Sequence, residues 1–461
     1  MAVGSELSLT FLGGAGTVTG SKYMITSQKR RFLIDCGLFQ GLKELRLKNW
    51  APLPIDAPSI ESVILTHAHI DHSGYLPRLF RQGFRGTVYS TEGTYELAKI
   101  MLPDAARIME EEAEYANQQG YSKHKPALPL FTSQDAQLAL SLFQPVKMGE
   151  EIKLGDHLSF TLHRAGHILG SSFCVFHHRK KSISIGFSGD LGRPNDPIMN
   201  PPVPMPDVHY LLLESTYGDR LHGKVNPLDE LADLIQYVVD HKSVLLIPAF
   251  AVGRTQEVLY FILQLKKSGR LNGVPVYLDS PMATAASELY WQFHQEHKLT
   301  KEQCEEINSI VTFVRNADQS IALLKKQSPK IIVSASGMAT GGRVLHHLRN
   351  YLGNPHNVVL FTGYQAEGTR GRTLVDGHES VKMHGVTVPV RAQIKNMGNL
   401  SAHADQEEIM DWLKASRLKP RKVFITHGEG PASEALAEKL REEFLWDVTI
   451  PSMGQEFPLV D

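Results

Sequence analysis

Thr66-His67-Ala68-His69-Ile70-Asp71-His72 is the stretch that decides the fold. It follows the apolar run Ser62-Val-Ile-Leu65, which predicts a β-strand, so its polar side chains are expected on the loop where that strand ends. In an extended loop the first two histidines point to one side, while the aspartate and the last histidine can turn toward a second position about 3.5 to 4 Å away. Such a cluster rarely has a purely structural explanation, so the stretch predicts a site for two metal ions.

Two residues farther along the chain extend this predicted site. His167 lies in Arg164-Ala-Gly-His-Ile-Leu-Gly170, and Asp190 ends Gly186-Phe-Ser-Gly-Asp190. Each follows a strand-like segment; alone each is more typical of a turn residue, but together with the first cluster they complete a metal site. Every donor is an imidazole or a carboxylate, a set that suits zinc and also manganese. Zinc is our first expectation.

The composition indicates a large folded protein of the cytoplasm. A chain of 461 residues allows roughly two to four domains, and 42 % apolar with 21 % charged residues excludes a disordered chain. The 48 basic residues nearly balance the 49 acidic ones, which leaves room only for a local basic cleft rather than bulk attraction to nucleic acid. The 3 cysteines lie far apart, as is typical of a reducing compartment. No signal sequence and no apolar run of about 18 residues is seen, so we expect no membrane association.

The two halves of the chain show different patterns. The segment 7–36 predicts a meander of strands, and 96–119 predicts a helix interrupted at Pro103. A proline-dense stretch at 194–206 predicts a domain boundary. Beyond it, strands alternate with helices, which predicts a parallel α/β layer; the pairs are 243–248 with 255–266, 276–279 with 283–297, and 330–334 with 343–352.

The order His-x-His-x-Asp-His, a distant histidine and then an aspartate resembles the metallo-β-lactamase superfamily. The resemblance implies a four-layer αβ/βα sandwich with two metals at one edge of its sheets. By that resemblance the first metal is bound by His67, His69 and His167, the second by Asp71 and His72, and Asp190 bridges them. Asp35, in Ile34-Asp35-Cys36-Gly37, matches an aspartate that orients a ligand, although an ordinary turn aspartate is equally consistent with its position.

The second half is similar to the β-CASP group of that superfamily, which processes nucleic acids. The matching segments are Glu214-Ser-Thr-Tyr-Gly218, Ser401-Ala-His403-Ala-Asp405, Thr426-His427-Gly-Glu429 and 361–372. The resemblance implies that Glu214 orients His403 and that His427 completes the second metal site. It also implies a discontinuous catalytic domain, residues 1–206 and 396–461, with an inserted parallel α/β β-CASP domain at 207–395.

The implied activity is hydrolysis of RNA phosphodiester bonds by a zinc-dependent ribonuclease, with a metal-bridging hydroxide as the nucleophile. His403, polarised by Glu214, is expected to protonate the leaving oxygen, and Asp71 is the third catalytic residue. The cofactor is expected to be two Zn²⁺ ions, with Mn²⁺ as the alternative. In this group a histidine at the position of His427 favours RNA over DNA, so single-stranded RNA is the expected partner.

Several alternatives stay open from the sequence. The chain could hydrolyse a small ester, lactone or thioester, or it could be a non-catalytic RNA-binding scaffold. Endonuclease and 5′ exonuclease action are both compatible with the motifs, and a homodimer is the general prior for its assembly. The glycine-bearing turn with Ser336, Gly337 and Arg343 could bind an RNA phosphate, but a tight strand-to-helix connection explains it equally well.

Overall fold

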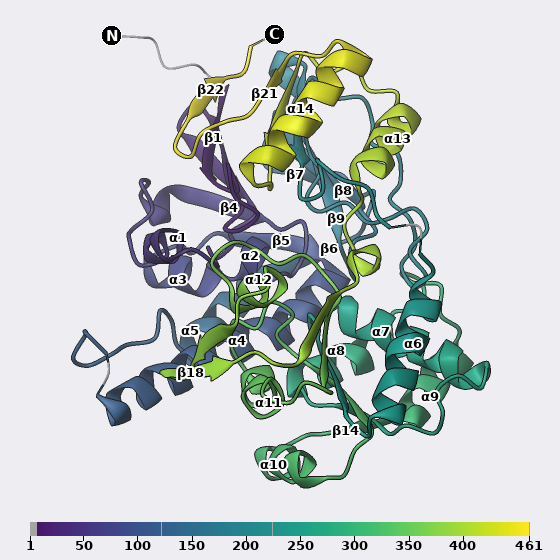
Figure 1. The fold of residues 1–461 in the computed structure, drawn as a ribbon. Helices are drawn as coiled ribbons and strands as arrows, with labels where there is room; N and C mark the ends of the chain where they lie inside the picture. Colours follow the sequence, from purple (N-terminus) through teal and green to yellow (C-terminus); the bar gives the residue numbers. More distant parts are fainter. Residues whose placement is uncertain (1–6, 121, 224, 461) are drawn as a thin grey trace. The chain divides into compact units, whose positions relative to one another are not determined.

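Strands from both ends of the chain build two seven-stranded β-sheets. The computed structural model describes residues 7–120, 122–223 and 225–460. The strand order is β22-β1-β2-β3-β4-β5-β6 in the first sheet and β21-β20-β11-β10-β9-β8-β7 in the second. The C-terminal strand β22 therefore lies beside β1 (Figure 1). The first sheet consists of β1 (Leu7–Gly13), β2 (Lys22–Ser27), β3 (Arg30–Ile34), β4 (Ile60–Ile64), β5 (Thr87–Thr91), β6 (Phe143–Val146) and β22 (Glu456–Pro458). The second consists of β7 (Ile152–Lys153), β8 (Leu158–Arg164), β9 (Ser172–His178), β10 (Ile183–Phe187), β11 (Tyr210–Glu214), β20 (Lys422–Thr426) and β21 (Val448–Thr449).

The two sheets pack face to face through large apolar side chains. Phe11 and Phe32 of the first sheet and Phe160 and Phe176 of the second belong to one buried cluster. The rings of Phe32 and Phe176 have centroids 5.7 Å apart. Burial contributes roughly 25 cal/mol per Å² of apolar surface, so this aromatic-rich layer fixes the two sheets against each other.

Helices cover the outer face of each sheet and complete four layers, αβ/βα. Leu76, Leu102 and Leu140 pack the first group of helices on the first sheet, and Leu413 and Leu436 pack α13 and α14 on the second. These helices are α1 (Lys43–Lys48), α2 (Ile70–Ser73), α3 (Leu76–Arg81), α4 (Glu92–Gln119), α5 (Ser133–Leu140), α13 (Gln406–Ser416) and α14 (Gly430–Phe444), with the 3₁₀ turns η1 (Ala57–Ser59) and η2 (Arg179–Lys181). Among the described residues, no helix is long and apolar enough to cross a membrane.

The predicted interruption at Pro103 is wrong, because α4 continues through this proline. Leu97 and Ala98 before it and Leu102 and Ala106 around it are all buried. This continuous buried face holds both halves of the helix on the sheet, which compensates for the backbone hydrogen bond that proline removes.

The chain folds into two compact units. Unit 1 contains Met1–Asp196, Asn200–Leu221 and His403–Asp461, and unit 2 contains Pro197–Met199 and His222–Ala402. Strand β11 lies between β10 and β20 in the second sheet of unit 1, whereas the sequence-based boundary at 206/207 assigns it to the inserted domain. The proline-dense stretch before β11 is thus a connection made largely within unit 1, because prolines exclude regular structure without requiring a new domain.

Unit 2 is built on a six-stranded sheet in which every pairing is parallel. Its order is β14-β13-β15-β12-β16-β19. The strands are β12 (Val244–Pro248), β13 (Val276–Leu278), β14 (Val311–Phe313), β15 (Lys330–Ser334), β16 (Val358–Phe361) and β19 (Gln393–Asn396). A hairpin of β17 (Ser380–Met383) and β18 (Val386–Pro389) accompanies them. The helices are α6 (Pro227–Asp240), α7 (Arg254–Lys267), α8 (Pro281–Tyr290), α9 (Lys301–Ile310), α10 (Ala317–Lys325), α11 (Arg343–Tyr351) and α12 (Arg370–Val375), with the 3₁₀ turn η3 (Gly398–Leu400).

One helix of unit 2 is shorter than predicted. The sequence pattern predicts a helix to residue 297, but α8 ends at Tyr290 and the chain continues in turns. His297 instead pairs with Met199 in an isolated β-bridge, and the Lys298 amide donates to the Ile198 carbonyl at 2.7 Å. These tertiary hydrogen bonds replace helical ones. Helix propensity is a local property, so it does not predict them.

Candidate active site

The predicted metal-binding side chains lie together in unit 1, on loops at the ends of strands. The stretch 67–72 follows β4 of the first sheet, while His167, Asp190 and His427 follow β8, β10 and β20 of the second. A rigid strand holds the start of each loop, so side chains distant in sequence are brought to one place.

The first group of donors is His67, His69, His167 and Asp190. His69 Nδ1 lies 3.1 Å from His67 Nε2 and 3.3 Å from His167 Nε2. Asp190 Oδ2 lies 3.4 Å from His67 Nε2 and 3.6 Å from His167 Nε2. Four ligands at about 2.0 to 2.1 Å from one tetrahedral ion are roughly 3.3 to 3.4 Å apart, so this spacing fits a zinc-sized cation.

The second group is Asp71, His72 and His427, with Asp190 again adjacent. His72 Nε2 lies 3.0 Å from His427 Nε2, and His427 Nε2 lies 3.5 Å from Asp71 Oδ2. Asp190 Oδ1 is 3.2 Å from His72 Nε2 and 3.6 Å from His427 Nδ1. The two carboxylate oxygens of Asp190 therefore face different groups of donors, which suits a ligand shared by two cations.

One buried polar atom supports the fit of a cation to these donors. Asp190 Oδ1 is buried and satisfies no hydrogen-bond geometry with any described residue. Burying a polar atom without a hydrogen bond costs about 1 to 3 kcal/mol, so such atoms usually have a further partner. The donor set of imidazoles and carboxylates makes a metal ion a suitable partner.

The protonation of the first group suits metal binding. Burial lowers the pKa of His67 to about 3, with the positive charge of His72 adding to the effect. Burial likewise lowers the pKa of His69 to about 4 and lowers that of His167 well below its usual range. These rings are neutral at pH 7, which is the form that binds metals.

Asp35 is placed to orient His72. It is buried, has φ 60°, and accepts a hydrogen bond of 2.8 Å from His72 Nδ1. It also accepts bonds from the Thr66 amide at 2.8 Å and from the Thr66 hydroxyl. With Nδ1 engaged, Nε2 of His72 is the nitrogen turned toward Asp190 and His427, as in carboxylate–histidine–metal arrangements.

His403 and Glu214 form a pair at the edge of the donors. His403 Nδ1 lies 3.1 Å from Glu214 Oε2, and its Nε2 lies 3.9 Å from Asp190 Oδ2. The Leu191 amide donates to Glu214 at 2.5 Å, and the Ala404 amide donates to the Leu191 carbonyl at 2.8 Å, so both partners are fixed. Burial opposes the charged ring, but the carboxylates of Glu214 and Asp190 outweigh it and raise the pKa of His403.

Sequence reasoning missed Thr216, although it lies within the Glu214–Gly218 motif. Its hydroxyl is 3.1 Å from His427 Nδ1 and 3.2 Å from the His427 carbonyl. His427 has φ 50°, a conformation uncommon outside glycine and asparagine, and its amide donates to the Gly14 carbonyl at 2.7 Å. Thr216 thus supports a residue held in a strained backbone conformation, and only the folded pairing of β11 with β20 reveals the contact.

The three residues considered for RNA phosphate binding have internal contacts in unit 2. Arg343 Nη1 donates to Asp279 Oδ1 at 2.8 Å and to the Val314 carbonyl at 3.0 Å. The Ser336 hydroxyl accepts from the Thr340 amide at 2.9 Å. A Cβ at Gly337 would lie 2.8 Å from the Phe250 amide nitrogen. A tight strand-to-helix connection accounts for these contacts, and phosphate binding stays a prediction.

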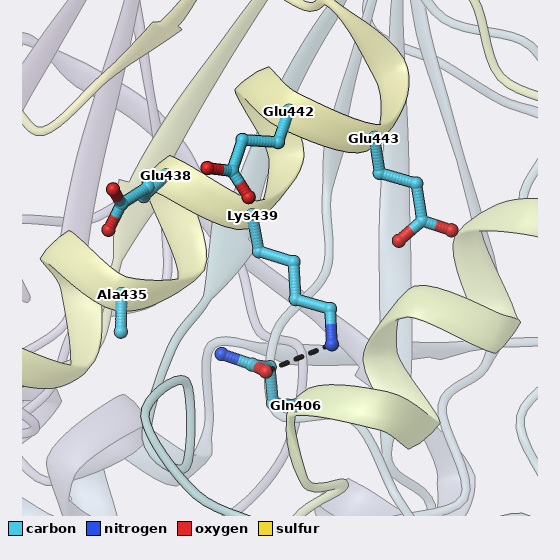
Figure 2. A pocket seen from close by; sticks show the side chains of 6 residues that line it. All are labelled: Gln406, Ala435, Glu438, Lys439, Glu442 and Glu443. Atoms are coloured by element: carbon cyan, nitrogen blue, oxygen red, sulfur yellow. Dashed lines mark hydrogen bonds between the residues drawn. The ribbon is translucent and has the colours of Figure 1, made fainter.

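A groove on unit 1 lies between α13 and α14 (Figure 2). It has a volume of about 540 Å³, and Glu438, Glu442 and Glu443 line it beside Lys439. The Lys439 ammonium donates to Gln406 Oε1 at 3.1 Å across the groove. Glu443 also pairs with Lys414 at 2.6 Å, but carboxylates still outnumber the lysines, so this groove is not suited to an RNA backbone.

Family models and known proteins match nearly the whole chain. Residues 15–221 match the family model of the metallo-beta-lactamase superfamily, 255–374 match the Beta-Casp domain, and 387–451 match the Zn-dependent metallo-hydrolase RNA specificity domain. The chain is 36 % identical to ribonuclease TTHA0252 of Thermus thermophilus, over 93 % of this chain and 94 % of that protein. It is 28 % identical to the transcription termination factor FttA of Methanocaldococcus jannaschii, over 96 % of this chain and 70 % of that protein.

A solved structure also shares the fold. A protein of unknown function from Enterococcus faecalis aligns with a TM-score of 0.51 at 14 % identity, covering 98 % of this chain and 100 % of that one.

Proposed function

Because the chain belongs to the β-CASP ribonuclease group of the metallo-β-lactamase superfamily, we propose that its unit 1 hydrolyses RNA phosphodiester bonds with two Zn²⁺ ions. The observation that carries the proposal is the convergence of six donor residues around Asp190, whose two oxygens face separate groups. The reaction takes place in the cytoplasm on single-stranded RNA.

The proposed ligand sets follow from these two groups. His67, His69 and His167 hold one ion, Asp71, His72 and His427 hold the other, and Asp190 is shared. When bound, zinc supplies an activated water at neutral pH and stabilises charge on the phosphate oxygens. The carboxylates also suit Mn²⁺, and the choice of zinc rests on the five imidazoles of the set.

His403 is the proposed general acid. Its Nδ1 is held by Glu214, and its Nε2 lies on the side of Asp190, 3.9 Å from Oδ2, where it would face the leaving oxygen. Glu214 itself is buried and accepts hydrogen bonds from the Leu191 and Thr216 amides, which hold its side chain beside the ring. A positioned acid of this kind contributes typically 10²- to 10⁴-fold to a proton-transfer step.

The test is cleavage of a structured, end-labelled RNA by zinc-loaded protein, resolved on a gel. The double variant Asp71→Ala, His72→Ala removes two donors, and His124→Ala, an exposed histidine of unit 1, is the matched control. Internal fragments given by the native protein and the control, and absent from the double variant, would establish an endonuclease; stepwise shortening would establish an exonuclease. A DNA strand of the same sequence tests the preference for RNA.

Two results would overturn the proposal. Cleavage that survives loss of Asp71 and His72 would separate the reaction from these donors. Absence of RNA cleavage by metal-loaded protein, with turnover of a small ester or thioester, would indicate the rival hydrolase activity.

A further inference from the structure

Unit 2 contains a second cluster of metal-binding side chains, remote in sequence from the donors of unit 1. One nitrogen each of His294 and His297 and the Cys304 sulfur all lie within 4.8 Å of one another. The cluster forms because α8 ends at Tyr290, so the histidines lie in the following turns rather than on a helix. Cys304 lies in the first turns of α9.

His297 has the hydrogen bonding expected of a metal ligand. Its Nε2–H donates to the Tyr290 carbonyl at 2.8 Å, which fixes the ring and its tautomer. Nδ1 is then the lone-pair nitrogen, and it accepts a longer bond of 3.2 Å from the Leu299 amide. Ligating histidines commonly donate their other N–H to a backbone carbonyl in this way. A metal ion at Nδ1 would replace this longer hydrogen bond from the Leu299 amide.

Cys304 supplies the sulfur ligand. It is a free cysteine whose side chain is buried. A buried cysteine by itself is ordinary core packing. Two imidazoles beside the sulfur change that expectation, because sulfur and imidazole together are the donors that zinc selects in structural sites.

We propose that His294, His297 and Cys304 bind one Zn²⁺ ion that joins the turns after α8 to α9, with solvent at the fourth position. Zinc ligands are roughly 3.3 to 3.8 Å apart in a tetrahedral site, so the donors must approach one another slightly. His294 is exposed, and its side chain can rotate inward without disturbing the core. The ion therefore stabilises this corner of unit 2.

Cobalt(II) absorption tests the site separately from the donors of unit 1. The intact protein is stripped of metal with a chelator and reloaded with Co²⁺ alone. A thiolate bound to Co²⁺ gives an intense charge-transfer band in the near ultraviolet, and the donors of unit 1 contain no sulfur. We expect this band in the native protein and its loss in Cys304→Ser, together with one fewer zinc ion per chain on zinc reloading.

Two further variants make the result decisive. His294→Ala alters an exposed residue, so it keeps the fold and is expected to weaken Co²⁺ binding by tenfold or more. Cys174→Ala changes a buried cysteine of β9 in unit 1 and is expected to retain the band. Absence of the band from native protein, or a band that survives both Cys304→Ser and His294→Ala, would overturn the proposal. The result is independent of RNA cleavage.

Discussion

At the scale of single residues, a substitution at His403 tests catalysis without removing a proposed metal ligand. Its Nε2 lies 3.9 Å from Asp190 Oδ2, whereas its Nδ1 lies 3.1 Å from Glu214 Oε2. We therefore expect His403→Ala to keep both zinc ions and to lower the cleavage rate by about 10²- to 10⁴-fold. Metal analysis and single-turnover cleavage check this. Unchanged turnover would remove His403 from the reaction.

Thr216 allows a finer test, because its side-chain hydroxyl contacts His427. Thr216→Val keeps the shape but removes the hydroxyl that lies 3.1 Å from His427 Nδ1. Loss of such an outer hydrogen bond typically costs about 10- to 100-fold in metal affinity or activity. We expect weaker binding of the second zinc ion, measured by competition with a chromogenic chelator, and recovery in Thr216→Ser. Equal affinities in all three proteins would mean that the hydroxyl serves packing alone.

The sequence indicates the candidate metal-binding residues more clearly than the residues that hold them in place by hydrogen bonds. His67, His69 and His72 stand out because they are crowded into one loop after an apolar strand. Thr216 has no such signal, since threonine is common in turns and its partner lies at position 427. A hydrogen bond between residues 211 positions apart depends on the pairing of β11 with β20, which only the folded chain shows.

At the scale of elements, β2 contains a lysine where the strand pattern calls for an apolar residue. Lys22 is 1 % exposed, donates to the Gly20 carbonyl at 3.2 Å and lies 4.4 Å from the ring centre of Phe39. Burial lowers its pKa from 10.5 to about 8. Between these two values the unfolded chain keeps a proton that the folded chain has released, so the free energy of unfolding rises with pH across this window.

Lys22→Met removes that titration. Each pKa unit corresponds to about 1.4 kcal/mol, so the native protein should gain up to about 3 kcal/mol relative to the variant between pH 8 and 10.5. Guanidinium unfolding of both proteins at several pH values measures the difference, which cancels groups that titrate in both. Parallel pH curves would show that the buried ammonium has an ordinary pKa.

The elements themselves were largely predictable where hydrophobic periodicity is strong. The helices α7 and α11 begin and end within one residue of the predicted 255–266 and 343–352. The errors at Pro103 and after Tyr290 have a common physical origin. In α4 burial holds a helix together across a proline, and after α8 backbone bonds to residues 198 and 199 end a helix that propensity would continue.

At the scale of the whole molecule, the resemblance to the metallo-β-lactamase superfamily implied four layers that strand periodicity alone could not. A pattern of alternating residues predicts strands but not their partners, and β11 beside β20 joins residues from the two ends of the chain. The same limit explains the domain boundary. Prolines at 194–206 are visible in the sequence, whereas the position of β11 in the sheet of unit 1 is a tertiary fact.

The donors of unit 1 come from both sheets, so metal binding should also stabilise the fold. The loop 67–72 extends from the first sheet, and His167, Asp190 and His427 extend from the second. An ion that binds only the folded state stabilises it by about 4 kcal/mol at a free concentration 1,000 times its Kd. We expect a chelator to lower the melting temperature of native protein in scanning calorimetry, and to lower it less in Asp190→Asn, which weakens both ligand sets.

The Cys304→Ser background makes this measurement specific, because it removes the site proposed in unit 2 and leaves the donors of unit 1 intact. In one outcome, the chelator lowers the melting temperature of Cys304→Ser as much as that of the native protein, and lowers it less in the double variant with Asp190→Asn. The stabilising ion is then bound by the donors of unit 1, which come from both sheets. A shift that vanishes in Cys304→Ser alone would instead place the stabilising ion in unit 2, and the two sheets of unit 1 would then be held by their aromatic core without a metal. The comparison therefore decides whether the cation is part of the fold of unit 1 or only of its chemistry.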